Sequence, residues 1–199
     1  MSTGVSTPPS TATTGVTRTP TSPTTGTPTS TSTVSDPNAR RTGIPAVDDV
    51  IDAMLGGNAV TLIHLVEFTP MPCVPAKAVY QPLQCPDGVS EGAIIQVLPI
   101  IACEGTYGTP EMTTRNYENL VDWEPALYAV LGVGSAWPYG PADYVIVFSY
   151  DLPAEGTYGI GLVVAGDRIV GTWVGCQPLT ERITEYLIAR GAPVILPPN

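Results

Sequence analysis

Hydrophobic residues recur at two spacings along residues 44–199, and the spacing predicts where helices and strands lie. Apolar side chains three and four positions apart predict a helix that begins at Pro45 and ends at Gly56 and Gly57. The same spacing predicts three more helices, over residues 59–68, 111–123 and 180–190.

Runs of β-branched and aromatic residues predict the strands. The strongest signal is 157–174, where Gly166 and Asp167 tolerate the positive φ angles of a tight hairpin turn. Further strands are expected over 93–102, 127–133 and 144–150. Together the elements predict an α+β fold in which a curved antiparallel sheet carries helices packed on one face.

Residues 1–43 have a different composition. Thr, Ser and Pro dominate the stretch from Ser2 to Ser35, so ordering it would cost backbone entropy without burying apolar surface. We expect a disordered arm over 1–43 and a single globular domain over 44–199. Such an arm acts as an extended spacer or, if its hydroxyls carry O-linked sugar, as a stiffened stalk; an inert linker is the alternative.

Charge narrows the class of partner. The chain has 18 acidic and 8 basic residues, a net charge of -10, and most of the acidic residues lie in the domain. An acidic surface repels phosphate backbones and anionic lipids, so nucleic acid is not an expected partner. There is also no apolar run of about 18 residues, so no transmembrane span is predicted.

Four cysteines allow three disulfide connectivities. Cys73 and Cys85 bracket a short proline-rich loop, and a bridge between them would stabilise the fold by about 3 kcal/mol on the chain-entropy model. That pairing is our preference, which leaves Cys103 to pair with Cys176 by elimination.

Disulfides and a Thr/Ser/Pro stalk are typical of exported proteins, so we expect an extracellular or cell-surface location. The first residues of the chain do not form a secretion signal. For an exported protein we therefore expect a leader ahead of this arm, for example that of a lipoprotein. The alternative is a cytosolic protein with reduced thiols.

The order of elements resembles the NTF2-like, or cystatin-like cone, superfamily: two short helices, a strand, a helix and a series of long antiparallel strands. The stretch 46–58, AVDDVIDAMLGGN, is similar to the opening helix and glycine turn of that group. The resemblance covers most of 44–174 and implies a cone with a pocket. It implies no particular activity, and the loop at 73–85 and a C-terminal helix depart from the pattern.

Residues that drive common chemistry are few. His64 is the one candidate general base, although its helical phase places it beside Glu67 as a surface pair. Asp48 and Asp52 share a helix face and could hold a hard cation, but acids early in a helix also complement its dipole. The scattered cysteines and single histidine do not form a zinc motif, and no phosphate-binding loop occurs, so we predict no metal and no cofactor.

The loop 135–143 is the most suggestive binding feature. Trp137 and Tyr139 lie among turn formers, where exposed rings could stack on a glycan or dock a protein; rings folded back on the sheet are the alternative. We therefore expect a surface-displayed structural or binding module, in one variant a self-associating fibre subunit, and not an enzyme.

The alternative function is an NTF2-like enzyme or small-molecule carrier. A cavity lined by His64 or by two carboxylates would favour the enzyme. A cavity filled by Trp123, Tyr144 and Trp173 would favour the module.

Overall fold

The computed structural model describes residues 40–74, 83–102, 105–152, 156–174 and 180–198. They all belong to one unit, Ser35–Asn199. The arm predicted over 1–43 therefore lies outside the described residues up to position 39.

Within the described residues, four α-helices form where the apolar spacing predicts them. Asn58 accepts a hydrogen bond from the Thr61 backbone at the start of the second helix, and Thr109 accepts one from Met112 at the start of the third. The second helix is shorter than predicted because the chain becomes extended at Val66. The helices are α1 (Pro45–Leu55), α2 (Ala59–Leu65), α3 (Pro110–Asp122) and α4 (Thr180–Ile188).

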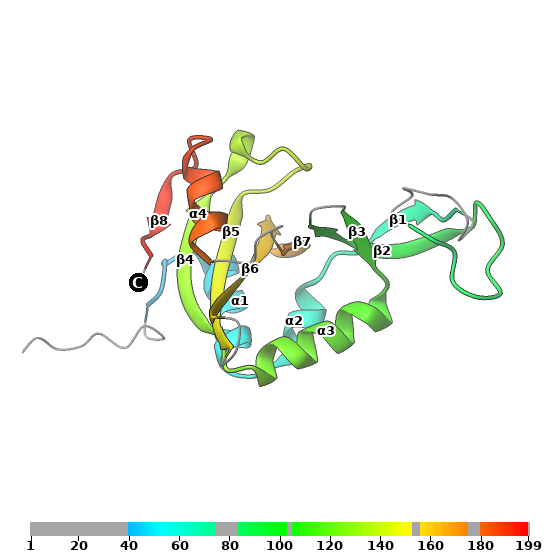
Figure 1. Ribbon diagram of the computed structural model, residues 1–199, viewed down its shortest axis with the longest axis horizontal. Coiled ribbons are helices and arrows are strands. Elements are labelled where there is room, and N and C mark those ends of the chain that lie inside the picture. The colour runs from blue at the N-terminus through cyan, green and yellow to red at the C-terminus, as the bar shows by residue number, and fades with distance from the viewer. Residues whose placement is uncertain (1–39, 75–82, 103–104, 153–155, 175–179, 199) are drawn as a thin grey trace, which may run out of the picture. The chain divides into compact units, whose positions relative to one another are not determined.

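The strands form one sheet in the order β1-β2-β7-β6-β5-β4-β8, and β3 pairs with β2 (Figure 1). The predicted hairpin is confirmed, with its turn between β6 and β7 and a φ of 58° at Gly166. The strands are β1 (Thr69–Pro72), β2 (Ile94–Ile101), β3 (Thr106–Gly108), β4 (Ala126–Gly132), β5 (Tyr144–Leu152), β6 (Gly156–Ala165), β7 (Arg168–Trp173) and β8 (Val194–Leu196).

The α+β class is confirmed, but the sheet is mixed and not wholly antiparallel. β2 pairs with β7 in parallel, Ile100 opposite Thr172 and Ile101 opposite Trp173. A tight hairpin forces neighbouring strands to run antiparallel, whereas β2 and β7 are joined through many other elements and are free to run in the same direction. Three short strands were also not predicted: β1, β3 and β8. Prolines within β1 and around β8 hide the strand signal, and both strands lie at the edges of the sheet, where proline is tolerated.

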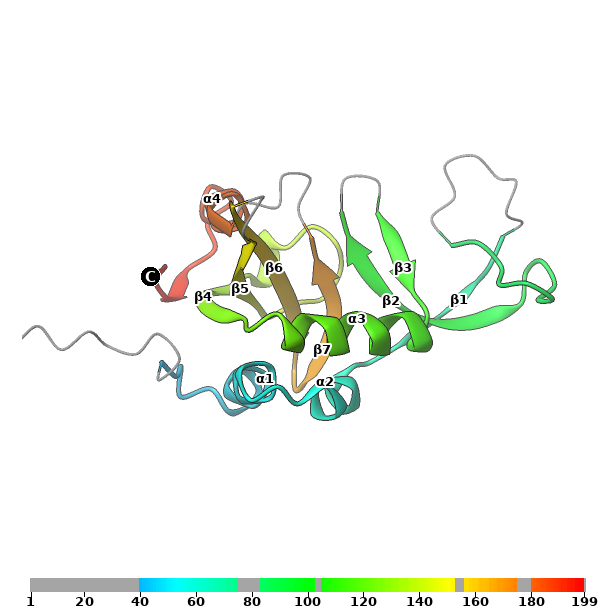
Figure 2. The same cartoon turned by 60° about the horizontal axis from the view of Figure 1, so that its bottom comes forward.

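The helices also cover both faces of the sheet and not one. α1, α2 and α3 pack on one face, where Ile146 and Phe148 point, and α4 packs on the other, where Val145 and Val147 point (Figure 2). Strands that are apolar on both sides need cover on both sides, which explains why α4 lies opposite the other helices.

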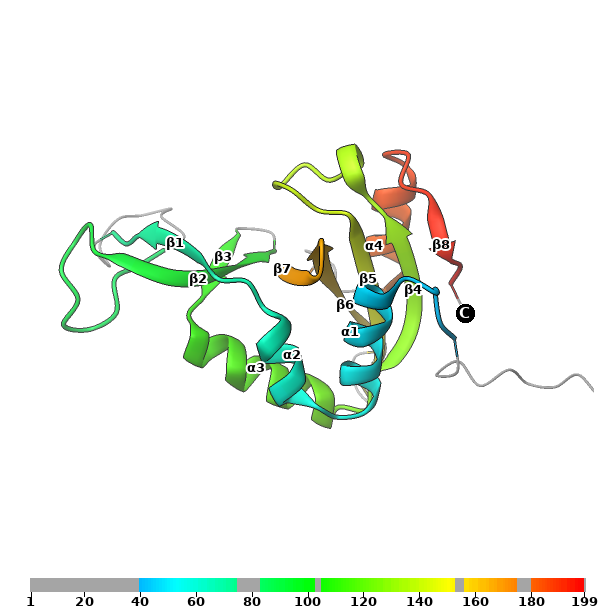
Figure 3. The ribbon, with the colours of Figure 1, turned by 180° about the vertical axis from the view of Figure 1, so that it is seen from behind.

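α3 is positioned by α2 on one side and by the sheet on the other (Figure 3). Its buried side chains are Thr113, Tyr117 and Leu120, one helical face. The other face of α3 is polar, and its Glu111, Glu118 and Asp122 are exposed. No helix among the described residues is long and apolar enough to cross a membrane.

Candidate functional site

Two hollows are candidate binding sites, and both lie where β2 meets β7. These strands pair through only two residue positions each. Leu98 and Ile100 of β2 line one hollow, while Pro99 and Ile101 line the other. Because successive side chains of a strand point to opposite faces, the two hollows open on opposite faces of the sheet.

The first hollow, which we call the α3 cavity, lies between α3 and the strands β2, β6 and β7. Its volume is about 170 Å³. Apolar and aromatic side chains form most of the wall, and no Asp, Glu, Lys, Arg or His is among the described residues that line it. They are Leu98, Ile100, Thr113, Asn116, Tyr117, Asn119, Leu120, Trp123, Tyr158, Ile160, Thr172 and Val174.

A buried hydrogen bond joins the two sides of the α3 cavity. The hydroxyl oxygens of Tyr117 and Thr172 are 3.1 Å apart, and these residues are only 1% and 5% exposed. Burial raises the pKa of Tyr117, and the bond to Thr172 offsets part of that rise. The pair is therefore neutral and fixes α3 to β7.

The mouth of the α3 cavity is polar and aromatic. Asn116, Asn119 and Trp123 line the cavity and are also exposed, so they stand between its interior and solvent. The Trp123 ring meets the buried Tyr150 ring edge to face, with centroids 5.9 Å apart. Burial raises the pKa of Tyr150 as well, so its ring is also neutral at physiological pH.

The second hollow, which we call the Tyr139 hollow, has a volume of about 310 Å³. It gathers Glu67 from the α2–β1 connection, Thr69 from the start of β1, residues of the loop between β4 and β5, and the floor of the sheet. Gly171 belongs to that floor: a Cβ there would lie 3.3 Å from the Ile101 side chain. The lining residues are Glu67, Thr69, Pro99, Ile101, Trp137, Tyr139, Pro141, Val163, Ala165, Val170 and Gly171.

The two predicted binding aromatics both line the Tyr139 hollow but differ in exposure. Tyr139 is 56% exposed, whereas Trp137 is only 6% exposed, so the expectation of two exposed rings holds for Tyr139 alone. Trp137 packs edge to face against Tyr139 and Trp173, with centroids 5.3 and 5.6 Å away. Trp173 in turn contacts Tyr186 of α4. A ring inserted among other rings gains contact area that an exposed loop position would forfeit.

The Tyr186 hydroxyl of α4 and partial burial raise the pKa of Tyr139. The guanidinium of Arg190 lies over the Tyr186 ring, 4.5 Å from its centroid. These contacts hold Tyr139 in place while leaving more than half of its surface open.

His64 is exposed and lines neither hollow. Its backbone carbonyl accepts a hydrogen bond of 2.9 Å from the Arg168 side chain. This contact involves the backbone of His64 and not its imidazole ring. Glu67, its predicted surface partner, instead lines the Tyr139 hollow. The sequence did not predict this placement, because α2 ends at Leu65 and the helical phase no longer applies two residues later.

Asp48 and Asp52 of α1 contact residues just before the helix. Asp48 accepts hydrogen bonds from the Thr42 backbone and hydroxyl, both at 2.8 Å, and from the Gly43 backbone at 2.9 Å. Asp52 forms an ion pair with Arg41. These contacts agree with the alternative to a cation site, in which the acids stabilise the helix start.

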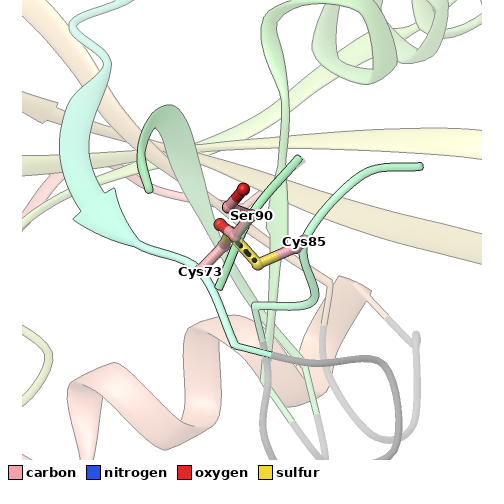
Figure 4. The surroundings of a disulfide bond; sticks show 3 residues. All are labelled: Cys73, Cys85 and Ser90. Atoms are coloured by element: carbon pink, nitrogen blue, oxygen red, sulfur yellow. Dashed lines mark hydrogen bonds between the residues drawn. A yellow bond between two sulfur atoms is a disulfide. The ribbon is translucent and has the colours of Figure 1, made fainter. Parts of the chain in front are cut away.

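The predicted Cys73–Cys85 disulfide is present (Figure 4). The Ser90 carbonyl oxygen lies 3.6 Å from each sulfur, and the Gly92 backbone donates to the Cys73 carbonyl. The bridge therefore joins the end of β1 to the segment that leads into β2. Cys103 and Cys176, the other predicted pair, lie outside the described residues.

The sequence did not identify Tyr117, Thr172 or the asparagines of α3 as parts of a site. The positions of Thr113, Asn116 and Tyr117 on one helical face were available as a signal, but nothing local indicates which strand they meet. Thr172 comes from a strand that is 55 residues away.

No family model, curated protein or solved structure matches the chain. The resemblance to the NTF2-like superfamily therefore stays a prediction.

Proposed function

We propose that residues 44–199 form an exported, surface-displayed binding module that holds a neutral glycan in the Tyr139 hollow. The observation that carries the proposal is that one exposed ring and one carboxylate line the same hollow, Tyr139 and Glu67. Sugars bind proteins by stacking their C–H faces on aromatic rings and by donating hydroxyl hydrogens to carboxylates.

The extracellular part of the proposal is supported by the Cys73–Cys85 bridge and by the composition of residues 1–43. Disulfides persist in oxidising compartments and are rare where thiols are kept reduced. A Thr/Ser/Pro arm of about 40 residues in polyproline-II conformation would reach roughly 120 Å from an anchor.

Glycan binding is tested with the oxidised full chain on an array of neutral glucose, galactose, mannose and N-acetylglucosamine oligosaccharides. Tyr139→Ala removes the stacking face and Glu67→Gln removes the charge at constant size. We expect each to weaken binding at least about tenfold, a cost of about 1.4 kcal/mol.

The matched controls lie away from the Tyr139 hollow. Trp123→Ala removes an exposed ring beside the α3 cavity, and Glu118→Gln neutralises an exposed carboxylate on α3. Both should bind the same oligosaccharides as the unaltered chain. The proposal fails if no sugar binds, or if the control variants lose as much affinity as Tyr139→Ala.

Location is tested separately, by mass spectrometry of the native protein. Hexose increments on residues 1–43 and four blocked thiols would support an extracellular stalk. An unmodified chain with free thiols would contradict it and favour the cytosolic alternative.

A second candidate function, small-molecule carrier, is favoured by one observation: the α3 cavity lies behind the sheet and is not filled by side chains. Trp173 packs on the opposite face, and Trp123 lies at the mouth. The enzyme variant of this alternative has less support, because neither His64 nor any carboxylate is among the described residues that line the cavity.

A further inference from the structure

We infer that the α3 cavity is a binding site for a small uncharged ring compound with one hydrogen-bonding substituent, such as phenol or benzyl alcohol. This inference rests on the second function proposed above, that of a small-molecule carrier. It is independent of glycan binding in the Tyr139 hollow, which lies on the other face of the sheet.

The size of the cavity sets the size of the ligand. Its volume is about 170 Å³. Apolar cavities of roughly 150 Å³ in other proteins stay dry and bind benzene. One six-membered ring with a short substituent therefore fits, whereas a disaccharide, a nucleotide or a long acyl chain does not.

The wall of the cavity sets the polarity of the ligand. Leu98, Leu120 and Ile160 are buried apolar residues of three different elements, and they would surround a ring on several sides. The hydroxyls of Tyr117 and Thr172 are bonded to each other, whereas the Thr113 hydroxyl is buried in the wall without a hydrogen-bond partner. Apolar side chains still form most of the wall, which therefore favours the carbon atoms of a ring over strongly polar groups.

The charge of the lining excludes ionic ligands. Among the residues that the structure describes, no side chain that is charged at neutral pH lines the cavity, so a carboxylate or ammonium would lose its hydration without gaining a counter-charge from them. Tyr117 stays neutral because burial raises its pKa. The net charge of the chain, -10, disfavours anions further.

The mouth determines where the polar substituent lies. The amides of Asn116 and Asn119 each offer a donor and an acceptor at the exposed edge of the cavity. A hydroxyl carried by the ring can reach them while the ring stays among the apolar residues. The mouth therefore discriminates phenol from toluene, and the deep part discriminates both from charged analogues.

The experiment measures binding of benzyl alcohol, phenol, toluene, benzoate and benzylamine to the oxidised full chain, by calorimetry and ligand-observed NMR. We expect the two alcohols to bind most tightly. Toluene should bind about threefold to tenfold more weakly, since one hydrogen bond contributes about 0.5–1.5 kcal/mol. Benzoate and benzylamine should not bind measurably.

Two variants locate the site. Asn116→Trp places a large ring at the mouth and should weaken benzyl alcohol binding at least about tenfold. Met112→Trp is the matched control, because Met112 is 48% exposed on the same helix and does not line the cavity; its affinity should stay within about twofold. Asn116→Leu with Asn119→Leu should bind toluene and phenol equally, because the amides that distinguish them are gone.

Three results would overturn the inference: equal binding by the Asn116→Trp and Met112→Trp variants, binding of benzoate as tight as that of benzyl alcohol, or no binding of any ring compound. The carrier function has its own readout, native mass spectrometry of the purified full chain. A bound compound of another class that Asn116→Trp releases would sink the ring inference and leave the carrier function standing. No bound compound and no ring binding would remove both.

Discussion

The residue Gly159 shows how one missing side chain lets an element pack. A Cβ at this position of β6 would lie 2.6 Å from the backbone Cα of Thr180, the first residue of α4. Backbone atoms cannot yield as a side chain can, so Gly159→Ala has to displace α4. We expect a loss of about 2 kcal/mol in the free energy of unfolding, measured with urea.

Gly132→Ala is the control for that substitution. Its Cβ would meet only side chains, the nearest being Pro193 at 3.3 Å. A loss below about 1 kcal/mol is expected there. Equal losses for the two variants would show that α4 does not depend on the close approach at Gly159.

At the same scale, the Tyr117–Thr172 hydrogen bond connects α3 to β7 within the core. Thr172→Val leaves the Tyr117 hydroxyl buried without its partner and should cost about 1–3 kcal/mol. Tyr117→Phe together with Thr172→Val removes both polar groups, so the double variant should be more stable than the sum of the single losses predicts. A double-mutant cycle by urea unfolding measures the coupling, and zero coupling would contradict the described bond.

At the scale of an element, Asp48 of α1 holds the segment that leads into the helix. Asp48 accepts three hydrogen bonds from Thr42 and Gly43. Asp48→Ala should lower the free energy of unfolding by about 1–2 kcal/mol, because these donors lose a charged acceptor. Asp49→Ala, at the exposed neighbouring position, should change it by less than about 0.5 kcal/mol, and the reverse order would be inconsistent with this role of Asp48.

Elements whose signals are local could be predicted well. α1 has the predicted bounds, because Pro45 begins it, Gly56 and Gly57 end it, and its apolar spacing is unbroken. β1 and β8 could not be predicted, because they are short and contain or adjoin prolines. Such strands exist only because a longer strand offers them a free edge.

At the scale of the whole molecule, the Cys73–Cys85 bridge joins β1 to the segment before β2, which has only a small cluster of buried residues of its own. Replacing both cysteines by alanine should lower the free energy of unfolding by about 3 kcal/mol, through the added entropy of the unfolded chain. Ser90→Ala keeps the backbone carbonyl beside the sulfurs and should be neutral. Urea titration without reductant measures both, and a neutral double cysteine variant would mean that this segment holds without its bridge.

Local sequence signals predicted one part of the candidate sites, whereas contacts between distant parts of the chain determine the rest. The loop with Trp137 and Tyr139 was recognisable, since aromatic residues among turn formers stand out locally. The α3 cavity was not, because it needs α3 to lie over β2 and β7. Nor was the position of Glu67 in the wall of the Tyr139 hollow, which depends on how the chain leaves α2.

The sequence by itself determined the helices, the hairpin at Gly166, the Cys73–Cys85 pair and the α+β class, because each depends on spacings within a few turns or one short loop. Only the tertiary structure decided the parallel pairing of β2 with β7, the placement of α4 on the opposite face, and the two hollows where β2 meets β7. Those features depend on which buried faces fit together across the chain, and a local pattern fixes which side of an element is buried but not what covers it.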